Sequence, residues 1–458
     1  MAGDSKEVAR AHLADAGVDE LPDDWDVVTL GDLFTADRGI AVGVMYPGDH
    51  DPTGVPLIKA GDLNGSIINP QPDFRITKEK HHEYRRTALE GGELVMTLVG
   101  NVGQCAVVPP RMAGWNAARA VAVMRLADPS ETHFVQQCLL SRPLQHLMDV
   151  WCNTTVQATL NLREIRQLPL PWPPKQRRDA IAAFGKALDD KIDLNRRTNA
   201  TLEAMARALF QSWFVDFDPV RAKLAARPPT GLDQATAALF PDSFQDSSLG
   251  HIPKGWEVGS ILRQADLLSG GTPKTDEPAY WNGDVPWASA NDVSQCGEAF
   301  LVSTKRTITK QGVEESSTKI IPELATVVVA RGATTGRLTM FGHAMAMNQT
   351  CYGLRSKVGA PFALYCHARH FIERLVQGGH GSIFDTITTS TFEATDVLLA
   401  PKEVLLAFDK QVVPLFQQVR ANIHQSRTLA TLRDTLLPKL LRGELRISSA
   451  EQAANDAA

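Results

Sequence analysis

Two groups of residues have types that could support catalysis or metal binding, but their spacing departs from what that chemistry needs. Pro72-Asp73 followed by Lys78-Glu79-Lys80 is faintly similar to the core of a metal-dependent nuclease, yet the gap between the acidic residues is too short and their order is wrong. Cys366, His367 and His370 fit one face of a helix, but a cluster without a fourth ligand is usually part of the packing. We therefore predict no catalytic residue and no metal site.

The glycine-rich stretches predict no cofactor site either. The chain has no GxxxxGK[ST] phosphate-binding loop, no [DN]PP[YFW] tetrapeptide and no FxGxG-like loop for S-adenosylmethionine. Gly270-Gly271-Thr272 and residues 331–336 lack the spacing of a dinucleotide-binding loop, so we interpret them as turns. Asp62 and Asp292 recur at corresponding places, either as turn residues, which we favour, or as carboxylates that read a base.

The composition indicates a multidomain globular protein of the cytoplasm. A chain of 458 residues is too long for one core, and 43% hydrophobic with 22% charged residues is an ordinary balance. No apolar run of about eighteen residues and no apolar leader occurs, so we predict neither a membrane span nor a secretory signal. The six cysteines form no CxxC pair, which favours a reducing compartment. The net charge of −5 argues against nucleic-acid binding by bulk charge but allows a local basic groove.

A repeated heptad pattern predicts the elements that position the rest of the chain. Apolar residues recur at every seventh position in two stretches offset by 227 residues, which is typical of a helix that packs along a seam against another helix. The helix-pairing positions are Ile181, Leu188, Asn195, Leu202 and Leu209, and then Phe408, Leu415, Asn422, Leu429 and Leu436. An Asn at the midpoint of each series fixes the register, so we expect Asn195 and Asn422 to lie close together. These matches favour internal duplication over two unrelated amphipathic helices.

A companion seam four residues further on is weaker. Its members are Gly185, Ile192, Asn199, Ala206 and Trp213, and then Val412, Val419, Ser426, Arg433 and Leu440. We expect helices over about Lys175–Phe214 and Lys402–Leu441. Pro414 should kink the second helix or delay its start, and Pro438 should disturb its last turn, because proline removes one hydrogen bond and clashes with the preceding turn.

Two globular segments precede these helices and repeat each other in outline. Short β-type runs cut by Gly and Pro, such as 55–58, 93–99 and 120–124, are followed by a helical piece at about 133–150. Trp25 recurs as Trp256 and Glu93 as Glu323. We divide the chain into a short amphipathic lead-in (1–20), a first domain (21–173), a long helix (174–219), a linker by composition (220–250), a second domain (251–401), a second long helix (402–446) and a disordered tail (447–458). The predicted fold class is α+β with pseudo-twofold duplication, the two helices forming an antiparallel coiled coil.

Four stretches resemble the specificity subunit of type I restriction–modification enzymes. Residues 432–445 (LRDTLLPKLLRGEL) are similar to its C-terminal signature, and residues 209–220 (LFQSWFVDFDPV) to the end of its central helix. Residues 249–256 (LGHIPKGW) are similar to the entry of its second domain, and GGTPKT and YWNGDVPW within 270–287 to the opening of a target recognition domain. The first domain has residues 39–43 (GIAVG) instead of a GGTP-type opening, which implies a different half-site, and the second helix lacks the usual PPxxEQ start.

The resemblance implies a non-catalytic DNA-recognition subunit. Each target recognition domain would read one half of a split, asymmetric site in double-stranded DNA, and the paired helices would set the gap and bind two DNA methyltransferase subunits. Restriction–translocase subunits would join this core, and S-adenosylmethionine, ATP and Mg²⁺ would be held by these partners. Two other readings stay open, namely a self-sufficient DNA-modifying enzyme with a cryptic site and a coiled-coil adaptor without a DNA role.

Candidate DNA contacts follow from residue type, because Arg, Lys, Asn, Gln, Ser and Thr read bases and Arg and Lys bind phosphates. In the first domain they are Arg38, Lys59, Asn64, Arg75, Lys78, Lys80, Arg85, Arg86, Asn101 and Arg119. In the second they are Lys274, Thr275, Tyr280, Ser289, Asn291, Lys305, Arg306, Arg331, Asn348 and Gln349. Any one of them could equally be a solvated surface residue. The densest basic cluster lies at 78–86, where we favour contact with the DNA backbone.

Overall fold

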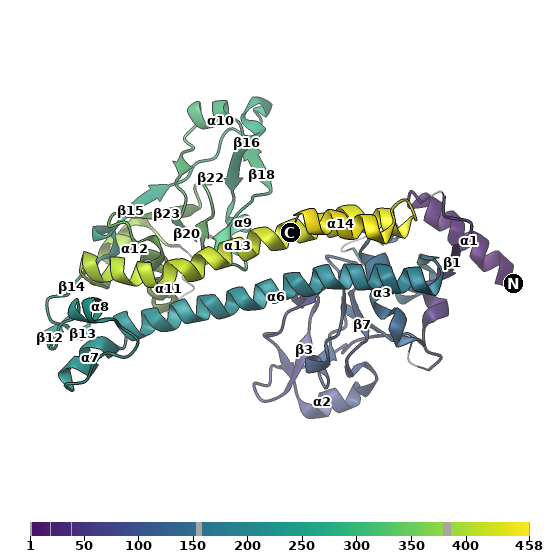
Figure 1. Cartoon of the computed structure of the whole chain (residues 1–458), viewed down its shortest axis with the longest axis horizontal. Helices are drawn as coiled ribbons and strands as arrows, with labels where there is room; N and C mark the ends of the chain where they lie inside the picture. The colour runs from purple at the N-terminus through teal and green to yellow at the C-terminus, as the bar shows by residue number, and fades with distance from the viewer. Residues whose placement is uncertain (1, 19, 38, 153–157, 379–385, 458) are drawn as a thin grey trace. The chain divides into compact units, whose positions relative to one another are not determined.

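The computed structural model describes residues 2–18, 20–37, 39–152, 158–378 and 386–457 (Figure 1). The chain divides into two compact units. Unit 1 comprises Met1–Leu194 and Gln425–Ala458, and unit 2 comprises Asn195–His424. Unit 1 is therefore built from two separate stretches of sequence, and each unit takes part of both long helices.

The two long helices begin and end where the heptad pattern predicts. Helix α6 spans Lys175–Phe214 and helix α13 spans Lys402–Leu441. The predicted late start at Pro414 is wrong, because α13 runs through that residue as one helix. Val412 and Phe416 on either side of it are buried in unit 2, and this packing offsets the hydrogen bond that proline removes.

Unit 1 is organised around a four-stranded antiparallel sheet in the order β2-β10-β7-β8. One face of β7 and β10 packs against helices α3 and α4, and the other packs against a smaller sheet of order β6-β3-β9, so both strands are buried throughout. The strands are β1 (Asp26–Thr29), β2 (Ile40–Val42), β3 (Val55–Ile58), β4 (Leu63–Asn64), β5 (Ile67–Ile68), β6 (Arg75–Ile76), β7 (Leu94–Thr97), β8 (Cys105–Val107), β9 (Asn116–Ala117), β10 (Val121–Met124) and β11 (Pro169–Trp172). The helices are α1 (Ala2–Asp15), α2 (Lys78–Glu83), α3 (Thr132–Leu140), α4 (Arg142–Trp151) and α5 (Leu162–Gln167), with α14 (Ile447–Ala457) from the second stretch.

Unit 2 contains a five-stranded sheet of order β15-β23-β20-β21-β17 and a four-stranded sheet of order β18-β16-β22-β19. The strands are β12 (Phe244–Ser247), β13 (Gly250–Pro253), β14 (Glu257–Ser260), β15 (Ala265–Ser269), β16 (Trp281–Ala288), β17 (Phe300–Leu301), β18 (Arg306–Ile308), β19 (Ile320–Ile321), β20 (Thr326–Val329), β21 (Leu338–Phe341), β22 (Met345–Met347), β23 (Cys351–Ser356) and β24 (Asp396–Leu399). The helices are α7 (Asp218–Leu224), α8 (Gln234–Ala238), α9 (Ala290–Gln295), α10 (Lys310–Glu314), α11 (Pro361–Gly378) and α12 (Thr389–Ala394).

The two units share one topology, which confirms the predicted internal duplication. The order β2-β10-β7-β8 in unit 1 corresponds to β15-β23-β20-β21 in unit 2, and β6-β3-β9 corresponds to β18-β16-β22. In both small sheets one pair is antiparallel and the other, β3 with β9 or β16 with β22, is parallel. The pair β1–β11 is likewise repeated as β14–β24.

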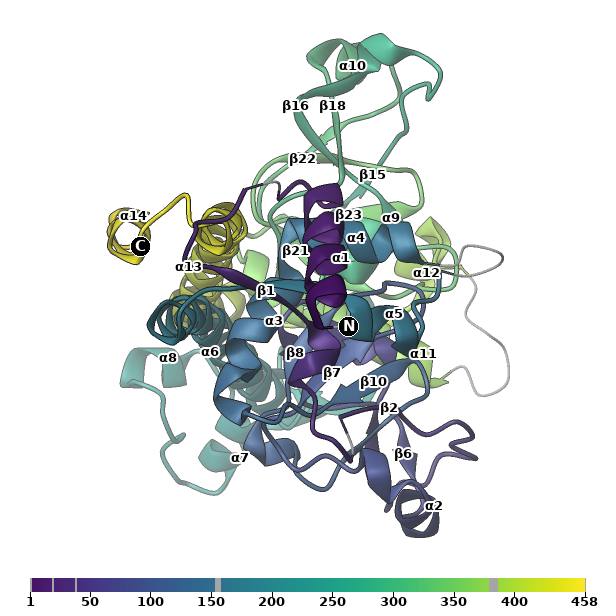
Figure 2. The same ribbon diagram turned by 90° about the vertical axis from the view of Figure 1, so that its right-hand side faces the viewer.

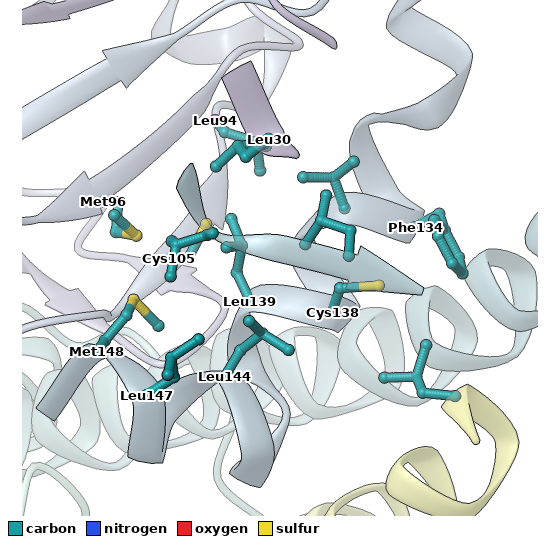
Figure 3. Packing of buried hydrophobic residues seen from close by; sticks show 14 of the residues in the cluster. Leu30, Leu94, Met96, Cys105, Phe134, Cys138, Leu139, Leu144, Leu147 and Met148 are labelled. Atoms are coloured by element: carbon teal, nitrogen blue, oxygen red, sulfur yellow. The ribbon is translucent and has the colours of Figure 1, made fainter. Parts of the chain in front are cut away.

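The predicted helical piece at 133–150 is two helices, α3 and α4. Ser141 between them is extended (φ −68°, ψ 148°), because the ring of Pro143 favours a helix start near that point. The break turns both helices onto the sheet, where Leu139, Leu144 and Met148 share one core with Leu94 and Met96 (Figure 3). Burial also raises the pKa of the Cys105 and Cys138 thiols in this core, so both act as inert apolar side chains.

Two predicted boundaries differ from the structure. The segment predicted as a linker (220–250) folds into helices α7 and α8 and strand β12, and Val220 and Phe240 are buried in the core of unit 2. The tail predicted as disordered (447–458) forms α14 over Ile447–Ala457, and Ala450 is buried in the core of unit 1. Alanine is the best helix former, so the small residues that suggested disorder instead permit a helix with one apolar side.

In unit 2 the two long helices pack antiparallel. Asn195 Nδ2 donates to the carbonyl of Asn422 at 3.4 Å, and Asn422 Nδ2 donates to Asn199 Oδ1 at 2.8 Å. Further along, the Phe210 ring meets the Phe408 ring edge to face with centroids 6.0 Å apart. The expected proximity of Asn195 and Asn422 is therefore observed, and Asn199 from the companion seam completes the polar layer.

In unit 1 the remaining halves of α6 and α13 are joined by a buried ion pair. Arg433 Nη1 contacts Asp189 Oδ1 at 2.6 Å, and their side chains are 18% and 13% exposed. Gln137 of α3 donates to Asp189 Oδ2 at 3.2 Å. Gly185 leaves room for this side chain, because a Cβ at that position would lie only 2.5 Å from Gln137 Cδ. The companion seam, predicted as the weaker one, is the more continuously buried, because the domain helices cover it as well.

Asp409 on α13 gives unit 2 a specific pH dependence. Its Oδ1 accepts from the backbone N–H groups of Phe362 and Ala363 at 2.8 and 2.9 Å, and burial raises its pKa from 3.8 to about 6. Between about pH 4 and pH 6 the folded state keeps a proton that the unfolded chain has released. The free energy of unfolding is therefore expected to fall by roughly 3 kcal/mol as the pH rises from about 4 to about 6. Urea denaturation should show this slope vanish in Asp409→Asn and persist in a control at the exposed Asp276, Asp276→Asn.

Candidate nucleic-acid interface

The basic cluster of unit 1 is carried by α2 and the single 3-10 turn Arg85–Thr87. Thr77 caps α2 by accepting from Lys80 N at 3.2 Å. Lys80 pairs with Glu83 at 2.6 Å and lies 5.8 Å from the centre of the Tyr84 ring. Arg85 and Arg86 are exposed, and within the described residues their side chains have no hydrogen-bond or ion-pair partner. The cluster is thus partly neutralised at Lys80 and open at the two arginines.

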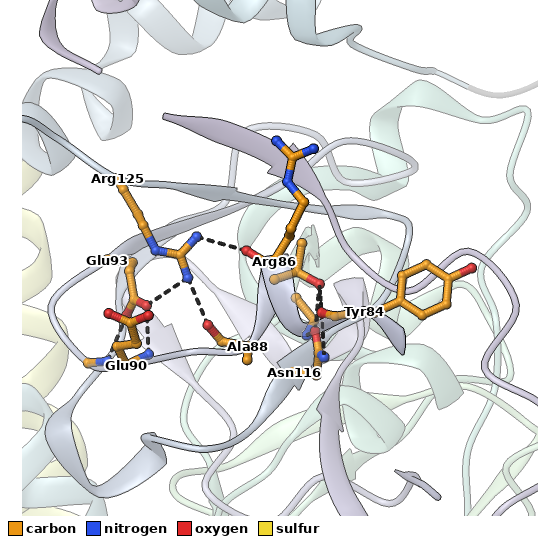
Figure 4. Close-up of polar contacts among 10 residues, drawn as sticks. Tyr84, Arg86, Ala88, Glu90, Glu93, Asn116 and Arg125 are labelled. Carbon is orange, nitrogen blue, oxygen red and sulfur yellow. Dashed lines mark hydrogen bonds and ion pairs between the residues drawn. The ribbon is translucent and has the colours of Figure 1, made fainter. Parts of the chain in front are cut away.

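A buried ion pair holds the backbone beneath these arginines (Figure 4). Arg125 donates to the carbonyls of Arg86 and Ala88 at 3.1 and 2.7 Å and to Glu93 Oε1 at 3.2 Å. The carboxylate of Glu93 also accepts from the N–H groups of Glu90 and Gly91 at 2.6 and 2.7 Å. The Arg125 and Glu93 side chains are 13% and 5% exposed. This network fixes the turn without using the exposed side chains.

Asn116 of β9 fixes the other side of the turn. Its Oδ1 accepts from Thr87 Oγ1 at 2.8 Å, and its Nδ2 donates to the Tyr84 carbonyl at 3.3 Å. Figure 4 shows the Arg86 guanidinium and the Tyr84 ring directed away from this network. Residues 84–86 therefore present a cationic and aromatic surface on a rigid base, which suits contact with a phosphate backbone.

Some of the other candidates in unit 1 are held by contacts within the protein, and the rest are exposed to solvent. Lys59 pairs with Asp73 at 2.6 Å and lies 5.7 Å from the centre of the Phe74 ring. Arg75 donates to the Gly54 carbonyl at 3.0 Å, so it stabilises a turn. Exposed positions that make no such contact within the described residues are Lys78, Asn64, Asn101 and Arg119. Arg38 lies outside the described residues.

In unit 2 the corresponding surface is built by α10, β16 and β18, which project away from α11 and α13 in Figures 1 and 2. Arg306 of β18 lies over Trp281 and near Trp287 of β16, with its Cζ 3.4 and 5.7 Å from the two ring centres. Tyr280 donates to Glu315 Oε2 at 3.0 Å, and this hydrogen bond raises the pKa of its hydroxyl.

The remaining candidates of unit 2 follow the same division. Ser289 caps α9, and Asn348 Oδ1 accepts from Thr350 Oγ1 at 2.9 Å. Gln349 Oε1 accepts a hydrogen bond from Thr272 Oγ1. These three residues therefore stabilise local structure. The exposed candidates are Lys274, Thr275, Asn291, Lys305 and Arg331. Lys305 and Arg306, which are adjacent in sequence, are both exposed where β18 begins.

Asp62 and Asp292 stabilise local backbone in both units. Asp62 accepts from Lys59 N at 2.8 Å and from Asn69 Nδ2 at 2.9 Å. Asp292 accepts from Ser289 N at 2.9 Å and from Lys305 N at 3.1 Å. Both residues are buried; Asp62 ends the 3-10 turn Ala60–Asp62, as the favoured turn interpretation predicts, whereas Asp292 lies in the first turn of α9.

Helix α11 carries Cys366, His367 and His370. In the described structure these side chains do not form a metal-binding cluster. The His367 and His370 rings pack near the Phe210 ring at 6.1 and 6.0 Å, and burial lowers the pKa of His367 to about 4. Across the described residues no group of three or more His, Cys, Asp or Glu side chains is placed to hold a metal ion.

Residue type alone missed the partners that organise these surfaces. Arg125 and Asn116 are buried parts of the unit 1 base, and Trp281 and Trp287 form the base in unit 2. The available signals were the recurrence of Glu93 and the two tryptophans close together in YWNGDVPW, but neither identifies a partner in space.

A family model matches this chain twice, in agreement with the duplicated architecture. The family described as type I restriction modification DNA specificity domain matches residues 22–204 and 253–432. The chain is 29% identical to the type I restriction enzyme HindI specificity subunit of Haemophilus influenzae, over 61% of this chain and 70% of that protein. It is 21% identical to the MjaIX specificity subunit of Methanocaldococcus jannaschii, over 94% and 95%. A crystal structure of a type I restriction–modification S subunit from M. genitalium is similar with a TM-score of 0.49 and 14% identity, over 91% and 96%.

Two copies of a mixed β domain, each packed on long paired helices, define the class of protein. The chain belongs to the type I restriction–modification DNA specificity family. Among the helices of the described residues, none combines the length and the apolar composition that a bilayer crossing needs.

Proposed function

We propose that this chain recognises DNA sequence as the specificity subunit of a type I restriction–modification complex and has no catalytic centre of its own. The observation that carries this proposal is the duplicated domain in a chain of this family, with an exposed cationic surface on a rigid base in each copy. The bases of these surfaces differ, since unit 1 uses an Arg125–Glu93 pair and unit 2 uses two tryptophans. Different surfaces suit the two different halves of an asymmetric site.

In this proposal each unit reads one half-site and the paired helices set the gap between them. The same helices bind two DNA methyltransferase subunits, and restriction–translocase subunits join that core in the cytoplasm. S-adenosylmethionine, ATP and Mg²⁺ belong to these partners. The relatives named above are specificity subunits, which supports this division of roles.

The gap is tested by lengthening both helices by one heptad, after Leu194 and after His424. Seven residues add about 10 Å of helix, which is roughly three base pairs of duplex. Single-molecule methylation mapping is expected to give the same two half-sites with a longer gap. Altered bases within a half-site would contradict the proposed role of the helices.

Two measurements separate the proposal from its alternatives. Purified chain incubated with DNA, Mg²⁺ and S-adenosylmethionine is expected to give no turnover, whereas methylation or cleavage would favour a self-sufficient enzyme. Binding of a random duplex should weaken steeply with salt, because several phosphate contacts release counterions. A flat salt dependence would favour an adaptor without a DNA role.

A further inference from the structure

Arg306 is held on a rigid aromatic base in the small sheet of unit 2. Its Cζ lies 3.4 Å from the centre of the Trp281 ring, which is van der Waals contact with the ring face. The Trp281 and Trp287 rings meet edge to face, with centroids 5.3 Å apart at 85°. Their indole N–H groups donate to the carbonyls of Lys274 and Gly271, each at 3.0 Å. The two tryptophan residues are 7% and 5% exposed, so neither ring is free to turn.

The backbone of Arg306 is restrained as well. It pairs with Trp287 across the sheet, and its carbonyl accepts from Thr304 Oγ1 at 2.7 Å. The preceding Lys305 N–H donates to the buried carboxylate of Asp292 at 3.1 Å. The Arg306 side chain is nevertheless exposed, and nowhere in the described part of the chain does another group accept a hydrogen bond from its guanidinium. Its five N–H donors are oriented in advance and available to a ligand.

From this geometry, and resting on the proposed function, we propose that Arg306 reads a guanine in the half-site recognised by unit 2. A planar guanidinium matches the O6 and N7 acceptors of guanine with two parallel hydrogen bonds, whereas adenine presents an N6 donor beside N7. Stacking on Trp281 fixes the plane of the fork before binding, which lowers the entropy lost on contact. Lys305 is a compact charge at the adjacent position and suits a phosphate.

Unit 1 lacks this arrangement at the equivalent position. Val55 pairs with Ile76 in the small sheet of unit 1, as Val285 pairs with Ile308 in unit 2. Two residues before each isoleucine stand Phe74 in unit 1 and Arg306 in unit 2. The cation beside Phe74 is Lys59, which is already paired with Asp73. The guanine requirement assigned to Arg306 therefore belongs to the half-site of unit 2.

The test is methylation mapping with the complete complex in cells that lack other DNA methylation. The half-site of unit 2 is assigned by exchanging residues 251–401 for the corresponding segment of a relative. Arg306→Lys keeps the charge but lacks the fork, and Arg306→Ala removes both. Each variant is expected to relax one guanine position of that half-site, with discrimination there falling about 5- to 150-fold. The other half-site and the gap should not change.

Lys305→Ala is the matched control, expected to lower methylation at every site without relaxing any base. If the Arg306 variants behave like this control, Arg306 contacts phosphate and the proposal is wrong. A variant too weak for mapping is tested by selection from randomised duplexes at low salt, where an unrelaxed guanine in Arg306→Lys would likewise overturn it. A wild-type complex that methylates no two-part site would refute the proposed function itself, a result distinct from either of these.

Discussion

Arg125→Ala is expected to lower the free energy of unfolding of this protein by about 3–5 kcal/mol. The substitution removes the three hydrogen bonds that Arg125 donates to Glu93 and to the carbonyls of Arg86 and Ala88. It also leaves the carboxylate of Glu93, with a side chain only 5% exposed, without its counter-charge. Urea denaturation of the purified chain, followed by tryptophan fluorescence, measures the loss.

Two variants show whether the unpaired charge causes that loss. Glu93→Gln added to Arg125→Ala should recover part of the stability, because an uncharged amide is less costly to bury than a lone carboxylate. The recovery is incomplete, because the amide NH2 group cannot accept from one of the two backbone N–H groups that Glu93 binds. Arg86→Ala removes an exposed side chain of the same type and should change stability by less than about 0.5 kcal/mol while weakening DNA binding. An Arg125→Ala chain as stable as Arg86→Ala would show that the network does not hold the turn.

Arg433→Ala is expected to have an effect of similar size, about 3–5 kcal/mol, on unit 1. Arg433 contacts Asp189 at 2.6 Å between the long helices, and Gln137 donates to the same carboxylate. Removing the guanidinium leaves the largely buried Asp189 carboxylate without a cation. Loss of stability on urea denaturation, together with earlier proteolysis of the long helices, checks this expectation.

The matched control for Arg433 is an exposed pair on the same helix. Lys186 and Asp190 are four residues apart on α6, and their side chains are 44% and 64% exposed. Lys186→Ala should cost only a few tenths of a kcal/mol. The double change Arg433→Met with Asp189→Asn should recover much of the loss, because it leaves no uncompensated charge between the helices. Equal losses in Arg433→Ala and Lys186→Ala would refute the assigned burial.

The long helices were predictable because a heptad repeat is a local signal. The Asn195–Asn422 contact follows from that spacing, and proline and glycine signals add the approximate ends of the helices. The greater burial of the companion seam could not be predicted from the sequence. A charged residue such as Arg433 argues against a buried seam unless its partner Asp189 is known. Gly185 likewise suggests a missing side chain in the seam, but the side chain of Gln137 occupies that space. Both depend on partners distant in sequence.

The candidate interface was predictable in type but not in arrangement. Residue chemistry selects Arg75, Arg86 and Arg306 alike, yet Arg75 bonds to a turn carbonyl, Arg86 is open and Arg306 is stacked on Trp281. The contacts of the three arginines depend on which strands become neighbours in the fold. The pairing of β16 with β18 places Arg306 against Trp287, and no local pattern contains that pairing.

The division of unit 1 into two stretches has a consequence for synthesis on the ribosome. Asp189 emerges early, whereas Arg433 follows only after the whole of unit 2 has been translated, a delay of roughly tens of seconds at about 5–20 residues per second. Unit 2 is contiguous and can complete its fold in that interval. The nascent first domain must meanwhile expose the apolar seam of α6 in unit 1, until the part of α13 that carries Arg433 has been made.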